Sequence, residues 1–325
     1  MSMSQKSKKS INKSFVEHWK EDVQKSVLYY NEWFLKFAPS TYIKSREEAI
    51  EKVENIFQRT DCLNSLSVNM LKSVPDSIII LRMATTPPLA RDRLVGLADI
   101  SRDLVKKLEN GELPKKQSEQ ETEIELDKIV KIIKKLLDTD IMPWLDKKSA
   151  PNEIDRLLAK QIIGDRVCGS LADPLIRNEQ EHRQLNYIKD FLIKKGYRFV
   201  ESKNISDVKL METGTFSFHL NVPVKNDLQK VNMPIDVVVK RKKSSKNEMP
   251  ILIECKSAGD FTNTNKRRKE EATKIKQLKD SYGDNVEFIL FLCGYFDTGY
   301  LGYEAAEGID WVWEHRIDDL LKAGI

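Results

Sequence analysis

Several features that would quickly assign a function are missing from this sequence. No apolar run approaches the roughly 20 residues that a membrane-spanning helix needs, and the amino terminus, MSMSQKSKKS, is polar and basic, unlike a secretory signal. The four cysteines lie far apart, with no C-x-x-C pair and no histidine at zinc-ligand spacing. We therefore expect a cytoplasmic protein with reduced cysteines and no membrane attachment.

Histidine patterns are also lacking, and the charge is unevenly distributed. The four histidines form neither an H-N-H nor an H-E-x-x-H pattern, so a nuclease built on histidine-bound metal is not indicated. The net charge is only +4, yet residues 236–280 hold 13 Lys and Arg against 7 Asp and Glu. Such a surplus favours a polyanionic partner at that place, although a solvated helix face would have the same composition.

The hydrophobic periodicity divides the 325 residues into three parts. Residues 1–14 carry four lysines and no acid, and predict a disordered basic tail. Residues 15–168 have helical periodicity almost throughout and predict an all-helical domain, with Pro39 ending its first helix. Residues 169–325 open with a Gly- and Pro-containing break, continue with a helix at about 175–195, and then mix strands with helices. The expected class is α+β: an α/β sandwich with a mixed sheet, preceded by the helical domain.

Two short helices joined by a tight turn are predicted at 90–111. The pattern L-A-x-I-S-x-x-x-V-x-x-L-E-N-G resembles a repressor-type helix-turn-helix, with the departure that Asp99 stands where a glycine usually makes the turn. In a helix-turn-helix, Arg102 and Lys106 on the second helix would face DNA. The alternative is a pair of packed helices inside the helical domain.

Two strand-like runs carry charges where apolar side chains would be expected. The run MPIDVVV holds Asp236 among β-branched residues, and the run PILIECKSA holds Glu254 and Lys256. Because side chains alternate between the faces of a strand, Glu254 and Lys256 project from the same face. Charges in buried strands are costly unless they are paired or bind a metal.

These charged residues predict metal-dependent hydrolysis of a phosphodiester. Asp236 and Glu254 offer the oxygen ligands that a hard divalent cation prefers, and the backbone carbonyl of Cys255 could add another. A cation held there would withdraw charge from the phosphodiester and lower the pKa of a bound water. Lys256 could orient or deprotonate the attacking water and stabilise negative charge on the phosphate. The alternative is a buried ion pair with a purely structural role.

The run that follows the Glu-x-Lys strand favours DNA as the partner. The segment FTNTNKRRKEE, residues 261–271, is predicted to begin a helix. Backbone amides at its start, together with Lys266, Arg267 and Arg268, could hold DNA phosphates. Such contacts would position a duplex without reading its bases. For any single one of these residues, an ordinary solvated helix start is the alternative.

The charged strands and their neighbours resemble those of a known family. The motif P-I-D-x17-E-C-K, in which Pro234, Asp236, Glu254 and Lys256 take the defining places, resembles that of the PD-(D/E)xK nuclease superfamily, with Ile235 as one inserted residue. The wider chain is similar to the XamI type of type II restriction endonucleases. The stretches that carry this similarity are PPLARDRLVGLA (87–98), ADPLIRNEQEHRQL (172–185) and GYFDTGYLGYEAAEGIDWVWEH (294–315).

The resemblance implies Mg²⁺-dependent cleavage of double-stranded DNA at a short, palindromic site. It also implies a restriction-modification system, in which a companion methyltransferase protects the host DNA. In such folds the helix before the sheet often offers one more carboxylate, and Glu181 is the candidate here. Symmetric cutting implies a C2 homodimer. Two alternatives stay open: a non-cleaving DNA-binding regulator, and a repair or structure-specific nuclease of the same fold.

Overall fold

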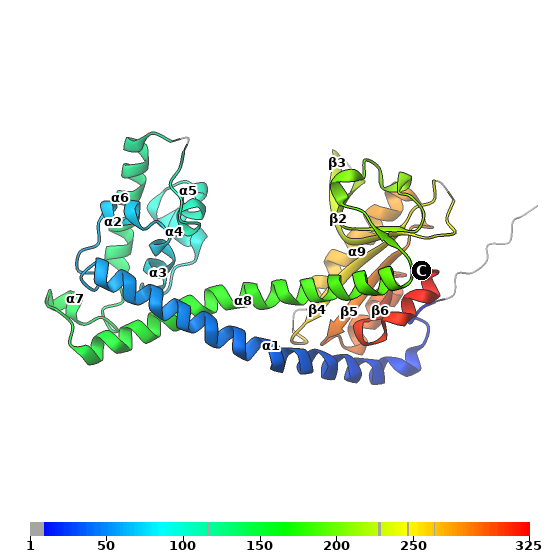
Figure 1. The fold of residues 1–325 in the computed structure, drawn as a ribbon, viewed down its shortest axis with the longest axis horizontal. Coiled ribbons are helices and arrows are strands. Elements are labelled where there is room, and N and C mark those ends of the chain that lie inside the picture. The colour runs from blue at the N-terminus through cyan, green and yellow to red at the C-terminus, as the bar shows by residue number, and fades with distance from the viewer. Residues whose placement is uncertain (1–9, 116, 227–228, 246, 263) are drawn as a thin grey trace, which may run out of the picture. The chain divides into compact units, whose positions relative to one another are not determined.

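The computed structural model describes residues 10–115, 117–226, 229–245, 247–262 and 264–325, without the side chains of residues 226, 229, 230 and 264–267. The chain forms two compact units (Figure 1). Of the described residues, 10–36 and 177–325 form the sheet unit and 37–176 form the helical unit. Helices α1 (Val16–Arg59) and α8 (Glu153–Lys194) each contribute to both units.

Both long helices continue through a proline. α1 contains Pro39 and α8 contains Pro174, so the expectations that Pro39 ends the first helix and that a break precedes residue 175 were wrong. A proline inside a helix removes one backbone hydrogen bond and crowds the preceding turn. Packing of the preceding residues offsets part of this cost, since Ala38 and Ala172, close to the two prolines, are almost completely buried. The division between the two units falls inside these helices, between residues 36 and 37 of α1 and between residues 176 and 177 of α8.

The helical unit is all-helical, as its periodicity predicts. Short helices surround an apolar core in which the indole of Trp144 is 2% exposed and donates a hydrogen bond of 2.9 Å to the carbonyl of Cys62. The helices that complete this unit are α2 (Val68–Ser73), α3 (Ser77–Met83), α4 (Arg91–Ala98), α5 (Arg102–Glu109), α6 (Glu119–Leu136) and α7 (Trp144–Lys147).

Helices α4 and α5 form the predicted pair at 90–111. Asp99 joins them with a φ of 48°, in the left-handed region where the resembled motif has glycine, and Asp is one of the few other residues that tolerate it. The hydroxyl of Ser101 caps α5 by accepting a hydrogen bond from the amide of Leu104. Arg102 and Lys106 are exposed on α5. The helix pair is present, and its contact with DNA stays a prediction.

A mixed sheet of six strands in the order β1-β2-β3-β4-β5-β6 is the centre of the sheet unit. β3 is antiparallel to both of its neighbours, β2 and β4, whereas β1 pairs with β2, β4 with β5 and β5 with β6 in parallel. The predicted α+β class is confirmed. The strands are β1 (Arg198–Phe199), β2 (Thr215–Asn226), β3 (Gln229–Lys240), β4 (Ile251–Ala258), β5 (Phe288–Gly294) and β6 (Asp310–Trp313).

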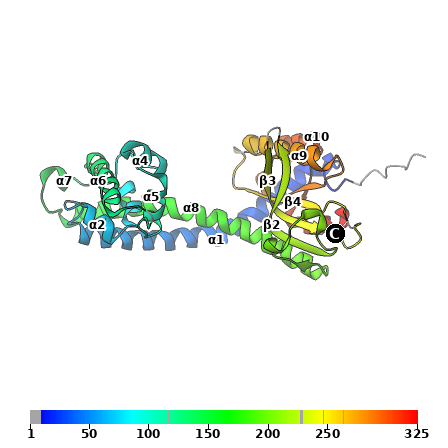
Figure 2. The same ribbon diagram turned by 90° about the horizontal axis from the view of Figure 1, so that it is seen from above.

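Helices cover both faces of this sheet (Figure 2). On one face, Ile188 and Phe191 of α8 pack with Val237 and Ile253 of the strands. On the other face lies a second core, formed by α9 (Thr264–Tyr282) and α10 (Thr298–Ala306) against β4, β5 and β6. The remaining helical segments of the unit are 3₁₀ turns at Ser202–Asn204, Val208–Leu210 and Glu314–Ala323.

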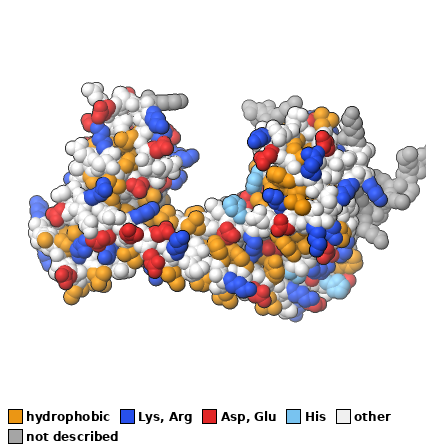
Figure 3. Space-filling model, viewed as in Figure 1, with side chains coloured by type: hydrophobic (Ala, Val, Ile, Leu, Met, Phe, Trp, Pro, Cys, Tyr) orange, Lys and Arg blue, Asp and Glu red, His pale blue; other side chains and the backbone are white. Residues whose placement is uncertain are grey.

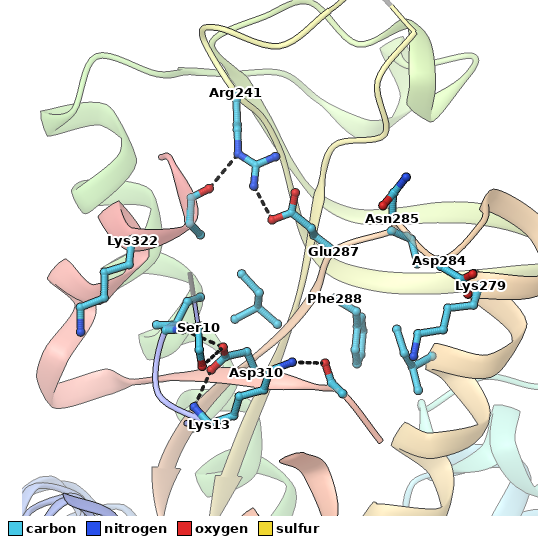
Figure 4. Close-up of a pocket in the computed structure, with 16 residues that line it drawn as sticks. Ser10, Lys13, Arg241, Lys279, Asp284, Asn285, Glu287, Phe288, Asp310 and Lys322 are labelled. Carbon is cyan, nitrogen blue, oxygen red and sulfur yellow. Dashed lines mark hydrogen bonds and ion pairs between the residues drawn. The ribbon is translucent and has the colours of Figure 1, made fainter. Parts of the chain in front are cut away.

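The segment before α1 is attached to the sheet. Residues 1–9, part of the predicted basic tail, lie outside the described residues, but residues 10–14 are ordered, which corrects the prediction for them. Asp310 accepts hydrogen bonds of 2.7–3.0 Å from the hydroxyl of Ser10 and from the backbone amides of the next three residues. Figure 4 shows Asp310 beside Ser10 and Lys13. Ile11 is buried in the core beneath α8. The carboxylate of Asp310 therefore provides the hydrogen-bond acceptor for four donors of residues 10–13.

The surface carries both signs of charge. On the face shown in Figure 3, Lys and Arg side chains are interspersed with Asp and Glu on each unit. All four cysteines are free thiols. Within the described ranges, no helix has the combined length and apolar character to cross a membrane.

Replacement of Asp310 should detach the segment before α1. We expect Asp310→Ala to lower the free energy of unfolding by about 2 kcal/mol, because hydrogen bonds to a charged acceptor contribute more than neutral ones and their donors lose their partner. Thermal unfolding measures this loss, and limited proteolysis should show earlier cleavage near residue 14. Asp318→Ala, at an exposed aspartate 3.8 Å from Lys195, is the control and should change neither reading. Equal stability of the two variants would contradict the prediction.

Candidate active site

Three neighbouring strands bring charged residues into one row. β2 and β3 pair on either side of His219 and Asp236, which places these two residues opposite each other. β3 and β4 pair up to Val237 and Ile253, and the next row of the same register joins Asp236 to Glu254. Beyond that row β4 stays paired with β5 but leaves β3. The two carboxylates therefore lie where two strands separate and the sheet opens.

Hydrogen bonds hold both carboxylates in place. Oδ2 of Asp236 accepts a bond of 2.8 Å from the amide of Cys255, which the separating strand leaves without a partner on β3. Oε1 of Glu254 accepts from the ammonium groups of Lys256 at 2.9 Å and of Lys274 at 2.5 Å. Glu254 is only 4% exposed, and its second oxygen, Oε2, has no hydrogen-bond partner among the described residues. A buried carboxylate oxygen without a donor is costly, and a cation would satisfy it.

The electrostatics of the pair favour a bound cation. Burial, followed by the charge of Glu254, raises the pKa of Asp236 to about 6. Burial alone would lower the pKa of Lys256, but the charges of Glu254, Glu271 and Asp236 outweigh it, and the pKa is raised. Lys256 is therefore an ammonium ion in this environment, suited to stabilising negative charge.

Helix α8 supplies the other wall of the site. Glu181, Gln180 and Gln184 line an open pocket of about 340 Å³ together with Asp236, Glu254, Cys255 and Lys256. Single ligand atoms of Glu181, His219 and Asp236 all lie within 4.8 Å of one another. The structure thus brings Glu181, selected from the sequence, next to Asp236; its role as a metal ligand stays a prediction.

Two residues of the site were not predicted from the sequence. Lys274 of α9 precedes Ile275 and lies four residues before Leu278, both of which are buried, so helical periodicity places it near the inward face. That periodicity was a usable signal. His219 lies on β2 in a run whose apolar alternation indicates only a half-buried strand, and no pattern there signals a site.

Two acids, Glu271 and Glu304, are buried on α9 and α10, and the charge of Glu271 acts on Lys256. Glu271 of α9 accepts a hydrogen bond of 2.6 Å from the hydroxyl of Tyr300. Burial, together with the charge of Glu271, raises the pKa of Glu304 to about 9. Glu304 therefore keeps its proton at neutral pH and shares it with Glu271.

The predicted phosphate contacts lie at the start of α9. The side chains of Lys266 and Arg267 are outside the described residues. The guanidinium of Arg268 stacks on the ring of Tyr303, 3.7 Å from its centroid. Arg268 is thus held at the start of α9, and its contact with DNA stays a prediction.

Comparison with known proteins identifies the family. The profile of the XamI restriction endonuclease family matches residues 61–313. The chain belongs to the XamI restriction endonuclease family. The type II restriction enzyme SalI from Streptomyces albus G is 48% identical over 314 residues, which cover 97% of this chain and 99% of that protein. The similarity to the XamI type that was inferred from the sequence is confirmed, and the match to the XamI profile runs through both units.

A solved structure gives a much weaker likeness. Protein VC1899 from Vibrio cholerae aligns with a TM-score of 0.27 and 12% identity. The alignment covers 86% of this chain but only 56% of that protein's chain. A likeness at this level supports no conclusion about fold or function.

The pair of buried acids Glu271 and Glu304 predicts a pH-dependent effect on stability. Because the pKa of Glu304 is raised in the folded state, its contribution to stability is complete below the ordinary carboxyl pKa and is lost as the pH rises towards about 9. Glu304→Gln keeps a donor for Glu271 but has no proton to lose. We therefore expect the free energy of unfolding of the variant, relative to that of the wild type, to increase with pH by up to ~1 kcal/mol per pH unit.

Chemical denaturation across this pH range measures the difference. Glu201→Gln, at an exposed glutamate whose charge does not contribute to the pKa of Glu304, is the control and should parallel the wild type. A constant difference between Glu304→Gln and the wild type at all pH values would refute the shared proton.

Proposed function

We propose that this member of the family is a type II restriction endonuclease that cleaves double-stranded DNA at a short specific site with Mg²⁺. The observation that carries the proposal is the pair of carboxylates, Asp236 and Glu254, at the point where β3 and β4 separate, with Lys256 beside them. Family membership supports cleavage over the alternative of a non-cleaving regulator, since the acid and lysine residues of the motif are all present.

The residues of the site fit a hard divalent cation. Asp236, the unpartnered Oε2 of Glu254 and the carbonyl of Cys255 are oxygen donors, and Glu181 lies close enough to Asp236 to add one more. When bound there, Mg²⁺ would polarise the scissile phosphate and lower the pKa of a coordinated water. Lys274 and Lys256 both bind Oε1 of Glu254, so the other oxygen is left to face a ligand.

Lys256 acts as a cation in this proposal. Its raised pKa and its bond to Glu254 keep the ammonium charged and in place. A charge fixed in advance beside the phosphate stabilises the negative charge that develops during hydrolysis, without reorganisation. The structure therefore supports charge stabilisation and water orientation by Lys256 over proton removal.

The contacts with DNA are proposed from two surfaces. Arg268, with Lys266 and Arg267 at the start of α9, would bind backbone phosphates near the cleavage site. Arg102 and Lys106 of α5 would contact DNA as the second helix of a helix-turn-helix. A C2 homodimer would place one such site on each strand of a palindrome. A companion methyltransferase would protect the same sequence in the cytoplasm.

Cleavage of a plasmid of known sequence tests the activity. We expect discrete fragments with Mg²⁺, none with EDTA, and a single recognition sequence when the ends are sequenced. Asp236→Ala and Lys256→Ala should each lower the cleavage rate by at least about a hundredfold, while DNA binding remains measurable. Glu212→Ala and Lys243→Ala, at exposed residues outside the pocket, are matched controls and should cut normally. Full cutting by Asp236→Ala would refute the site.

Salt dependence tests the proposed helix-turn-helix. Each phosphate contact adds close to one to the slope of log K against log salt, so Arg102→Ala combined with Lys106→Ala should lower that slope by up to about two. The pair Lys131→Ala and Lys135→Ala on α6, with the same spacing on an exposed helix face, is the control. Equal slopes for the two double variants would support the alternative of a packed helix pair without DNA contact.

A further inference from the structure

His219 has an unusual backbone for its place in the fold. It lies inside strand β2 with a φ of 49°, in the left-handed region. Among the described residues, the other non-glycine residues with positive φ all lie outside strands. A left-handed residue other than glycine is uncommon and costs conformational energy. This strained residue lies in the same row of the sheet as Asp236 and Glu254.

The strand changes face at this residue. Phe216 is buried in the core beneath α8, and Leu220 is buried in the core beneath α9, on the opposite side of the sheet. In a regular strand these two residues, four positions apart, would face the same side. β3 changes sides at the same row, since Ile235 and Val237 belong to the two different cores. The irregularity leaves the side chain of His219 exposed, 56% by area, next to α8.

The imidazole lies at a distance from two carboxylates that a cation could bridge. Its Nε2 is 3.8 Å from Oε1 of Glu181, too far for a hydrogen bond. One ligand atom from each of His219, Glu181 and Asp236 falls within 4.8 Å of the other two. Ligand atoms at ~2.1 Å from an octahedral ion are ~3 Å apart when adjacent and ~4.2 Å apart when opposite. Small side-chain rotations would therefore close the three atoms around one ion.

A separate observation points to a cation in the same pocket. Glu254 is 4% exposed, its Oε2 has no hydrogen-bond partner within the described part of the chain, and it lines the pocket with Glu181 and Asp236. Its other oxygen is neutralised by two lysines. The unpartnered oxygen of Glu254 therefore offers a ligand to a cation in this pocket, independently of His219.

We propose that His219, Glu181 and Asp236 form a second cation position, on the outer side of Asp236, that prefers Mn²⁺ or Co²⁺ to Mg²⁺. Imidazole nitrogen suits transition-metal ions, whereas Mg²⁺ favours an all-oxygen shell. The position shares Asp236 with the proposed Mg²⁺ site and rests on that proposed function to this extent. Glu181 is thereby assigned mainly to the outer ion, and the inner position keeps Glu254 and the carbonyl of Cys255.

Metal titration of the whole protein without DNA tests the position. After EDTA treatment and dialysis, free Mn²⁺ is followed by electron paramagnetic resonance and Mg²⁺ binding by calorimetry. His219→Asn removes the imidazole but keeps a residue that tolerates the left-handed backbone. We expect it to weaken Mn²⁺ binding by about tenfold or more and to leave Mg²⁺ binding unchanged. The control is His182→Asn, at an exposed histidine next to Glu181, which should bind both ions like the wild type.

A measurement on the wild type does not depend on how the variants fold. Diethyl pyrocarbonate modifies accessible imidazoles, and mass spectrometry locates the modified residues. Mn²⁺ should protect His219, whereas the exposed His18 and His182 should react equally with and without the ion. Modification of His219 that Mn²⁺ does not slow would overturn the proposal, leaving an ordinary pair of His219 with Glu181.

Glu254→Gln separates this inference from the proposed function. The variant removes a ligand of the inner position only, so Mg²⁺-dependent cleavage should be lost while the His219-dependent Mn²⁺ binding remains. Loss of cleavage in Glu254→Gln, together with unchanged Mn²⁺ binding in His219→Asn, would overturn the second position and leave the nuclease site standing. Retained cleavage in Glu254→Gln, with Mn²⁺ binding that still needs His219, would contradict the nuclease site and support the second position.

Discussion

The buried charge of Glu254 is the constraint on which the sheet unit depends. A carboxylate removed from water must be paired or bound to metal, and here two lysines from different elements, β4 and α9, reach a single oxygen. That pairing fixes α9 against the sheet at the same place where β3 leaves β4. The amide of Cys255, freed by the separation, is then satisfied by Asp236. The separation of β3 from β4 thus also brings the two acids together.

Much of this site could be predicted because its signals are local. An acid in a β-branched run, and an acid and a lysine two positions apart in another, are visible in the sequence, and strand periodicity gives their common face. The register could not be read from the spacing of 17 residues. That Asp236 meets Glu254, and that His219 lies opposite Asp236, depends on how the strands pair. Register is set by the two cores together.

The errors of prediction come from tertiary packing that overrides local preference. Pro39 and Pro174 would end isolated helices, but long packed helices tolerate the loss of one hydrogen bond. In a regular strand Phe216 and Leu220 would face the same side, yet the left-handed His219 divides them between two cores. Such a residue has no sequence signature, since its φ is imposed by the surrounding structure. Strain of this kind gathers where function constrains the backbone.

The basic surplus of residues 236–280 has a different meaning in the folded chain. It suggests a DNA-binding surface, but several of its cations serve the interior. Lys256 and Lys274 neutralise Glu254, Arg241 pairs with Glu287, and the ammonium of Lys240 donates to the carbonyl of Lys209. Acids buried in a protein core need nearby bases to balance their charge and hold them in place. Part of the local excess of positive charge therefore balances charges inside the protein and is not free to bind DNA. Positive charge for binding a duplex must then come from other surfaces as well.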